Sequence, residues 1–206
     1  MKTRNKALLL TLCAVALVVA TVFGTMAYLT STDKVENTFT VGNVAITLDE
    51  AKVNTDGTLV EGEGAGRVKA NTYKLMPGHT YTKDPTVHVD ADSENSWIFV
   101  KVENGIAAFE AATSAEEGGY KTIADQIAAN GWAELDDVAG VYYKEYNGED
   151  KNLVVFESFK MDDNANEVTG WDNISAETTK VTVTAYAVQK DGFDTAKAAW
   201  DATFGA

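Results

Sequence analysis

Segments in which apolar side chains occupy every second position recur along this chain, and they constrain its fold more than any other feature. Such alternation is typical of strands with one buried face, because successive side chains of a strand point to opposite faces of the sheet. The segments run over residues 38–41, 44–48, 87–89, 97–102 and 180–188. The sequence at 97–102 is apolar at almost every position, which predicts a central strand with both faces covered.

Two further patterns refine this prediction. Residues 180–188 place Val181 and the apolar residues at every second position after it on one face, where small side chains suit a crowded core. Asn147-Gly148 lies between the apolar residues 142–143 and 153–159 and suits the positive φ angles of a tight turn. We interpret residues 142–159 as a hairpin with a longer loop.

Two short helices are expected to interrupt the strands. Thr122 is a suitable N-cap for residues 123–130, in which two isoleucines lie one turn apart, and Gly131 would end this helix. Asp194 is the expected N-cap of a second helix over residues 195–203. Both helices are predicted to lie on the surface of the β scaffold.

Many short strands, two prolines and few helices favour an antiparallel β-sandwich over an α/β fold. We predict a mostly β chain: a jelly-roll-like sandwich over residues 28–206 with two short surface helices, preceded by an N-terminal signal helix. Residues 54–66 and 107–119 show no usable period and are expected to be loops. No repeat or linker indicates a second domain.

The first 27 residues have the three parts of a signal peptide in the required order. Basic residues at positions 2, 4 and 6 precede an apolar run over residues 7–23. Thr25 and Ala27 are the small residues that a signal peptidase reads, so cleavage would make Tyr28 the new N-terminus. An uncleaved anchor is the alternative, because the run approaches the length that spans a bilayer. Either outcome exports residues 28 onward, so we expect a secreted protein whose only membrane contact is an uncleaved signal.

Charge and cysteine usage exclude several classes of function. The formal net charge is −14, and removal of residues 1–27 would take away three basic and no acidic side chains. An acidic surface argues against nucleic acids and anionic lipids as partners, because both need a positive footprint. The only cysteine, Cys13, lies inside the apolar run, and the preceding Leu12 does not fit a lipoprotein signal. The exported part is therefore stabilised by packing alone, without disulfides or thiol chemistry.

Few patterns indicate catalysis or metal binding. His79 and His88 do not form a His-Glu-x-x-His pair, and no Gly-x-Ser-x-Gly elbow occurs, so we assign no catalytic residue. Asp162 to Glu167, and the acidic residues at 90, 92 and 94, place oxygen atoms at alternate positions. A calcium loop does the same, but so do solvated turns, and neither segment has the glycine and distal glutamate of an EF-hand. Calcium is thus the one cofactor left open.

The four tryptophans have two interpretations. They would either line a platform for carbohydrate or pack in the core, and each lies in or beside an element that needs a large apolar side chain. Core packing is therefore the expectation for Trp97, Trp132, Trp171 and Trp200.

Two motifs resemble the TasA/camelysin (CalY) family of secreted proteins from Gram-positive bacteria. The first is Gly24-Thr25-Met26-Ala27-Tyr28, followed by Asp33, Phe39, Gly42 and the segment 44–48. The second is Met76-Pro77-Gly78-His79-Thr80-Tyr81-Thr82-Lys83-Asp84, which is similar to the family's pattern of Pro-Gly and then Thr-Lys-Asp before a strand. Both motifs lie in the first half of the chain.

The resemblance implies a jelly-roll protein that is processed by a SipW-type signal peptidase and forms fibres of the extracellular biofilm matrix. In that family the segment freed by cleavage inserts as a strand into a neighbouring subunit. The corresponding segment here is 28–39, with Leu29, Val35 and Phe39 as the side chains that would plug the neighbour. The partner would be a second copy of the chain or a paralogous matrix protein. The camelysin branch carries a metallopeptidase label, so a secreted peptidase is one alternative, and a monomeric surface adhesin is another.

Overall fold

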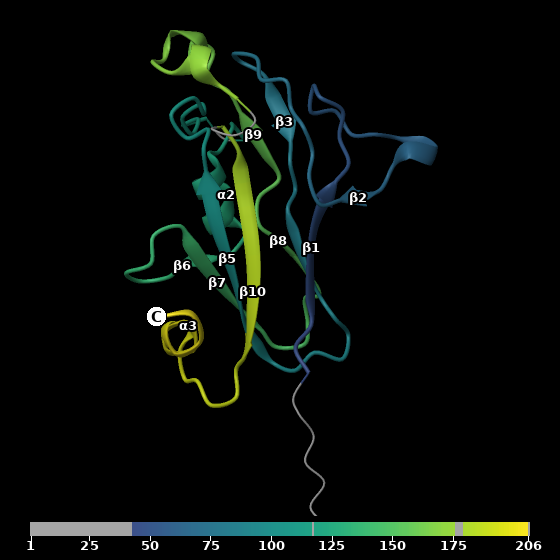
Figure 1. The fold of residues 1–206 in the computed structure, drawn as a ribbon, viewed down its shortest axis with the longest axis vertical. Coiled ribbons are helices and arrows are strands. Elements are labelled where there is room, and N and C mark those ends of the chain that lie inside the picture. The colour runs from purple at the N-terminus through teal and green to yellow at the C-terminus, as the bar shows by residue number, and fades with distance from the viewer. Residues whose placement is uncertain (1–42, 117, 176–178, 206) are drawn as a thin grey trace, which may run out of the picture. The chain divides into compact units, whose positions relative to one another are not determined.

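Apolar residues of the alternating segments pack between two antiparallel sheets in the computed structural model (Figure 1). The structure describes residues 43–116, 118–175 and 179–205, which belong to one compact unit. One sheet has the strand order β2-β1-β4-β8 and the other β10-β5-β7-β6, whereas β3 and β9 pair separately. The prediction of a mostly β antiparallel sandwich with two short α-helices is confirmed for these residues.

Most of the strands are short. They are β1 (Ile46–Ala51), β2 (Arg67–Val68), β3 (Thr80–Thr82), β4 (Thr86–Val89), β5 (Ser96–Asn104), β6 (Ala133–Glu134), β7 (Val141–Tyr146), β8 (Asn152–Val154), β9 (Ser158–Lys160) and β10 (Val181–Gln189). The α-helices are α2 (Ile123–Ala129) and α3 (Ala196–Phe204), and the 3-10 turns are η1 (Gly62–Gly64), η2 (Ala165–Glu167) and η3 (Trp171–Asn173).

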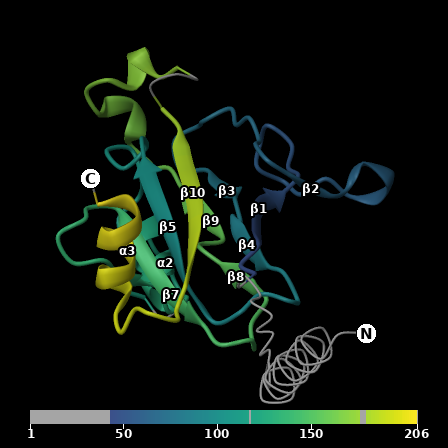
Figure 2. The same ribbon diagram turned by 60° about the horizontal axis from the view of Figure 1, so that its bottom comes forward.

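Strand β5 has buried side chains on both faces, as its composition predicts. It lies between β10 and β7, and its side chains Ile98 and Val100 enter the core between the sheets. Trp97 and Phe99 point the other way, into a second apolar cluster to which Trp200 of α3 belongs. In Figures 1 and 2, α3 and β1 accordingly lie on opposite sides of β10. The long apolar run is therefore explained by one sheet covered by a second sheet and by a helix.

The predicted hairpin over residues 142–159 is wrong. β7 pairs with β5 and β6, whereas β8 pairs with β4, so the two strands belong to different sheets. Asn147-Gly148 does turn the chain, with a φ of +94° at Gly148, but the turn leads across the sandwich. The segment 153–159 also divides between β8 and β9. β7 and β8 lie in different sheets because β7 pairs with β5 and β8 pairs with β4. A local turn signal carries no information about these partners.

Two element boundaries also differ from the predictions. α3 is capped by Thr195 and not by Asp194, since the Oγ1 atom of Thr195 accepts a hydrogen bond from the backbone N–H of Ala198 at 3.2 Å. The strand predicted over 44–48 begins at Ile46 and continues to Ala51, because pairing with β4 and β2 covers those residues.

Helix α2 begins where the sequence predicts. The Oγ1 atom of Thr122 accepts a hydrogen bond from the backbone N–H of Asp125 at 3.2 Å. Ile123 and Ile127 are buried in the core between the sheets, and Gly131 ends the helical segment with a φ of +78°. This short helix is thus held by one cap and two buried side chains.

The N-terminal predictions cannot be followed in the same way. The strand expected over 38–41 and the expected signal helix lie outside the described residues. No helix in the described part of the chain is sufficiently long and apolar to cross a membrane.

Candidate functional site

Helix α2 and the residues after it cover one open side of the sandwich, along β8 and β9. The Oε1 atom of Gln126 accepts hydrogen bonds from the backbone N–H groups of Glu157 and Ser158, at 3.0 and 3.2 Å. The Nε1 atom of Trp132 donates to the carbonyl oxygen of Val154 at 2.8 Å. These side chains occupy the backbone groups that an added strand would need, so this edge is closed to further pairing.

The outer edge of β10, unlike the edge along β8 and β9, has no described strand paired with it. The carbonyl oxygen of Lys180 and the N–H of Lys190 bond to the chain around β5, each at 2.9 Å, so even-numbered residues of β10 face β5. The backbone groups of Val181, Val183 and the following odd-numbered residues therefore point away from it. No strand of the described residues pairs with that edge. Within the part of the chain that the structure describes, β10 thus presents nine residues, about 30 Å of strand, with one side unpaired.

Strand β1 lies beside β10 and also has a partly open edge. It pairs with β4 over most of its length but with β2 only at its last two residues. The backbone groups of Ile46 and Leu48 face away from β4, and the carbonyl oxygen of Leu48 accepts a hydrogen bond from Lys69 Nζ at 2.6 Å. Cα atoms of β1 and β10 come within 8 Å of each other, yet the two strands do not pair.

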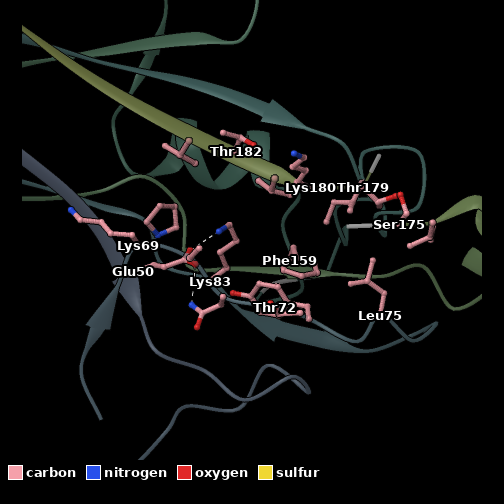
Figure 3. A pocket seen from close by; sticks show the side chains of 18 of the residues that line it. Glu50, Lys69, Thr72, Leu75, Lys83, Phe159, Ser175, Thr179, Lys180 and Thr182 are labelled. Carbon is pink, nitrogen blue, oxygen red and sulfur yellow. Dashed lines mark hydrogen bonds and ion pairs between the residues drawn. The ribbon is translucent and has the colours of Figure 1, made fainter. Parts of the chain in front are cut away.

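A groove of about 780 Å³ opens between these two strands (Figure 3). Its walls come from the start of β10, the end of β1 and residues 69–75. In Figure 3, Thr182 and Lys180 lie across the groove from Lys83 and Phe159. Apolar side chains line much of it, among them Leu48, Leu75, Ile106, Phe159, Ile174 and Val183. The groove therefore joins an unpaired strand edge to an apolar interior.

Three aromatic rings support the groove beside residues 69–75. Tyr81 stacks on Phe159 with ring centroids 4.8 Å apart, and Tyr73 packs edge-on against both, at 5.7 and 5.2 Å. The Tyr81 hydroxyl donates to the carbonyl oxygen of Lys74 at 2.7 Å and accepts from the N–H of Met76 at 2.8 Å. Burial raises the pKa of the Tyr73 and Tyr81 hydroxyls, so both stay protonated. This wall of the groove is rigid and uncharged.

A buried polar cluster, formed by Glu50, Asn71 and Lys83, lies next to these rings. Lys83 Nζ is 2.5 Å from Glu50 Oε2, and the two side chains are only 11% and 5% exposed. Asn71 Nδ2 donates to Glu50 Oε1 at 3.0 Å and to the carbonyl oxygen of Ala51 at 2.8 Å. Asn71 Oδ1 accepts from the N–H of Val53 at 3.0 Å. One carboxylate thus contacts both an amine and a carboxamide.

A second ionic cluster lies on the other face of β1. Arg67 forms ion pairs with Asp49 and Asp84, and its Nη1 atom is 2.9 Å from Asp84 Oδ2. His88 Nε2 is 2.8 Å from Asp49 Oδ1. Burial of Asp49 acts to raise its pKa, but the hydrogen bonds from Arg67 and His88 outweigh burial and hold the pKa below its ordinary value of 3.8.

We expect the stabilisation that Asp49 provides to disappear in acid. Because its folded-state pKa is lowered, the contribution is complete well above pH 3.8 and is lost as the pH falls through the folded-state pKa. The difference in unfolding free energy between the wild type and Asp49→Asn, measured by urea denaturation between pH 7 and pH 3, should shrink towards acid. A difference that stays constant over this range would contradict the assignment.

The two histidines lie in separate surroundings. His79 follows the turn at Gly78, and its Nε2 atom is 2.8 Å from the carbonyl oxygen of Asp56. His88 joins the Asp49 cluster described above. Within residues 43–116, 118–175 and 179–205, no three His, Cys, Asp or Glu side chains lie close enough together to hold a metal ion.

The acidic segments considered for calcium form hydrogen-bonded turns. Asp90 Oδ1 accepts from the N–H of Asp92 at 3.2 Å, and Asp162 Oδ1 accepts from the N–H of Asn164 at 2.8 Å. Both are turns in which an aspartate side chain bonds to the backbone two residues later.

The tryptophans pack against the apolar clusters. Trp97 and Trp132 are buried, and Trp171 and Trp200 are partly buried against the same clusters. Trp171 also lines the groove between β1 and β10. Their positions agree with the expected role in packing.

The residues predicted for processing and strand insertion cannot be placed. All of them lie outside the described residues: Thr25, Ala27, Tyr28, Leu29, Val35 and Phe39.

The groove and its buried polar cluster were not predicted from the sequence. A signal for the cluster is nevertheless present, because Ile46, Leu48 and Glu50 stand at alternate positions of one strand. Tyr81 and Lys83 are likewise two residues apart. Both charged residues therefore occupy positions at which the alternation places a buried side chain.

Comparison of the chain with family models, with curated proteins and with solved structures finds no match. The resemblance to the TasA/camelysin family therefore rests on its two motifs. The second motif lies in the described residues, where it forms β3 and supplies Lys83 and Asp84 to the two ionic clusters.

Proposed function

We propose that this chain is a secreted structural protein whose subunits assemble into extracellular fibres by adding a strand to one another. The observation that supports this proposal is the outer edge of β10, which pairs with no described strand and lies beside an apolar groove. Strand addition gains affinity from the backbone groups of such an edge and specificity from pockets for alternate side chains. An open edge of this length is otherwise a site of uncontrolled association.

The segment 28–39 has the properties that this edge requires. Positions 29, 35 and 39 differ by even numbers, so Leu29, Val35 and Phe39 would share one face of the segment when it adds as an extended strand. Twelve extended residues span about 40 Å, enough to follow β10 along its whole length. The polar residues 31–34 offer no apolar plug, so backbone hydrogen bonds to β10 carry the binding there. The donor is a second copy of this chain or a paralogous matrix protein.

Export and assembly are coupled in this proposal. Cleavage after Ala27 by a SipW-type signal peptidase would release Tyr28 as a free N-terminus, and only then would the arm be available to a neighbour. The fibre would accordingly form in the extracellular matrix or at the cell surface. No specific observation in the described residues favours a secreted metallopeptidase, and the chain is proposed as non-enzymatic.

Replacing Val183 by proline tests the acceptor edge. The N–H of Val183 points away from β5, so proline removes a donor from the open edge and leaves the β10–β5 ladder intact. We expect the secreted Val183→Pro protein to stay folded but to form no filaments in negative-stain electron microscopy. It should sediment as a monomer at concentrations at which the wild type assembles.

Val183→Ala is the matched control, because it shortens the same side chain but keeps the backbone N–H. This variant should still assemble. If the proline variant forms normal fibres, β10 is not the acceptor. If the wild type itself stays monomeric at every concentration, the fibre proposal is wrong and the monomeric adhesin becomes the favoured alternative.

A further inference from the structure

Three reactive groups from separate segments meet beside the groove. Glu50 comes from β1, Asn71 from the segment between β2 and β3, and Lys83 from the residue after β3. Figure 3 shows the side chains of Lys83 and Glu50 pointing toward one another. Glu50 Oε2 accepts a hydrogen bond from Lys83 Nζ, and Glu50 Oε1 accepts one from Asn71 Nδ2. The amine and the carboxamide are therefore bound to the same carboxylate.

The surroundings of Lys83 are unusual for a lysine. The residue is 9% exposed, and among the described residues its ammonium has one hydrogen-bond acceptor, Glu50, although it carries three N–H donors. The neighbouring wall is the apolar, aromatic part of the groove, with Tyr73 and Phe159. A buried ion pair is a costly way to stabilise a fold, because both charges lose water. The burial of Lys83 and Glu50 is therefore weak evidence for a purely stabilising role.

The carboxamide of Asn71 is held by hydrogen bonds at both its oxygen and its nitrogen. The N–H of Val53 donates to Asn71 Oδ1, and this bond would strengthen as negative charge develops on the oxygen. Asn71 Nδ2 donates to Glu50 and to the carbonyl oxygen of Ala51, which fixes the leaving group beside the carboxylate. Before any reaction, the amine and the carboxamide thus each contact the carboxylate that would carry the proton.

We propose that Lys83 and Asn71 form an intramolecular amide cross-link in the folded protein, with Glu50 as the proton carrier. Glu50 takes a proton from the Lys83 ammonium, and the free amine attacks Cγ of Asn71. The Nζ–Cγ bond forms, the Cγ–Nδ2 bond breaks, and Glu50 returns the proton to the departing nitrogen. The lysine nitrogen gives up a second proton as the amide forms, so the departing nitrogen leaves as an ammonium ion and Glu50 is again a carboxylate. No atom changes oxidation state, and no cofactor or co-reactant is required.

The cross-link would close a ring over residues 71–83. Residues 72–82, which include β3 and the Pro77-Gly78 turn, would then be bypassed when the chain is pulled between β2 and β4. This reaction needs only the groups inside one subunit, so the inference is independent of fibre assembly. A monomeric protein would form the same bond.

Mass spectrometry of the secreted wild-type protein tests whether the amide cross-link between Lys83 and Asn71 has formed. After its N-terminus is established by sequencing, its intact mass should be lower than the calculated mass by about 17 Da, the mass of one ammonia. Trypsin should yield a branched peptide that joins residues 70–74 to residues 75–101, because the modified Lys83 is no longer cleaved. Edman degradation of that peptide should release Ala70 and Leu75 together in the first cycle but only Met76 in the second, because Asn71 stays attached to Lys83.

Variants separate the three roles. Asn71→Ala and Lys83→Met remove a reacting group, and Glu50→Gln removes the proton carrier while both reacting groups stay, so all three should show the unmodified mass. Lys69→Met, which changes a lysine elsewhere on the groove, should keep the loss of ammonia. The wild-type result stands even if a variant fails to fold. An unmodified wild-type mass, ordinary cleavage after Lys83, or a bond that maps to another pair would overturn the proposal.

Discussion

A chain that lacks residues 28–37 is expected to form no fibres while its sandwich remains folded. The deletion removes two of the three plug residues and most of the backbone that would pair with β10. The described members of both apolar clusters are residues from Ile46 onward, and we expect their packing to hold the sandwich together after the deletion. Sedimentation velocity and negative-stain microscopy should show monomers only, and the far-ultraviolet circular dichroism should keep its β character.

A synthetic peptide of residues 28–39 provides the complementary experiment. It should bind the truncated chain with a stoichiometry of one, and Val183→Pro in the truncated chain should abolish that binding. A control peptide with serine at positions 29, 35 and 39 keeps the backbone but loses the plugs, so it should bind more weakly. Fibres formed by the truncated chain would refute the donor segment without bearing on the lysine–asparagine cross-link.

Gly57→Ala is expected to lower the unfolding free energy by about 3 kcal/mol or more. Gly57 has a φ of +83°, and a Cβ atom there would lie 2.7 Å from both the Cα and the Cδ1 atoms of Tyr81. Its carbonyl oxygen also accepts a hydrogen bond from the N–H of Thr82 at 3.2 Å, so the turn cannot move away from β3 without breaking that contact. Urea denaturation monitored by tryptophan fluorescence measures the loss.

Gly62→Ala is the matched control for this prediction. Gly62 has a similar φ of +71°, but nothing lies within 4 Å of the position that a Cβ atom would take. Its substitution should therefore cost only the backbone strain, about 1 kcal/mol. Equal losses for the two variants would show that the contact with Tyr81 contributes nothing.

Local patterns predicted those parts of the fold that depend on neighbours in sequence. The two-sided burial of residues 97–102 and the cap at Thr122 were both readable, because each depends on side-chain period or on one nearby hydrogen bond. The hairpin over residues 142–159 was wrong for the opposite reason. A turn signal says that the chain reverses, but the partner of each strand is set by strands elsewhere in the chain, here β4 and β5.

The site was less predictable than the fold. An unpaired edge is a property of the whole sheet order, so nothing within residues 181–189 distinguishes β10 from a strand paired on both sides. The buried cluster left a clearer trace, since Glu50 and Lys83 interrupt alternations that otherwise place apolar residues inside. A charged residue at a position where the alternation predicts burial indicates a nearby partner of opposite charge, because an unpaired charge is rarely buried.

Helix α2 and the residues after it cover the edge of the sandwich along β8 and β9, whereas no described strand pairs with the edge at β10. This difference determines how many neighbours each subunit would contact in the proposed fibre. If subunits assemble as proposed, with β10 as the acceptor edge and residues 28–39 as the donor, growth would be head-to-tail, unbranched and directional. The two ends of such a filament are chemically distinct, and free tail peptide would block elongation at only one of them.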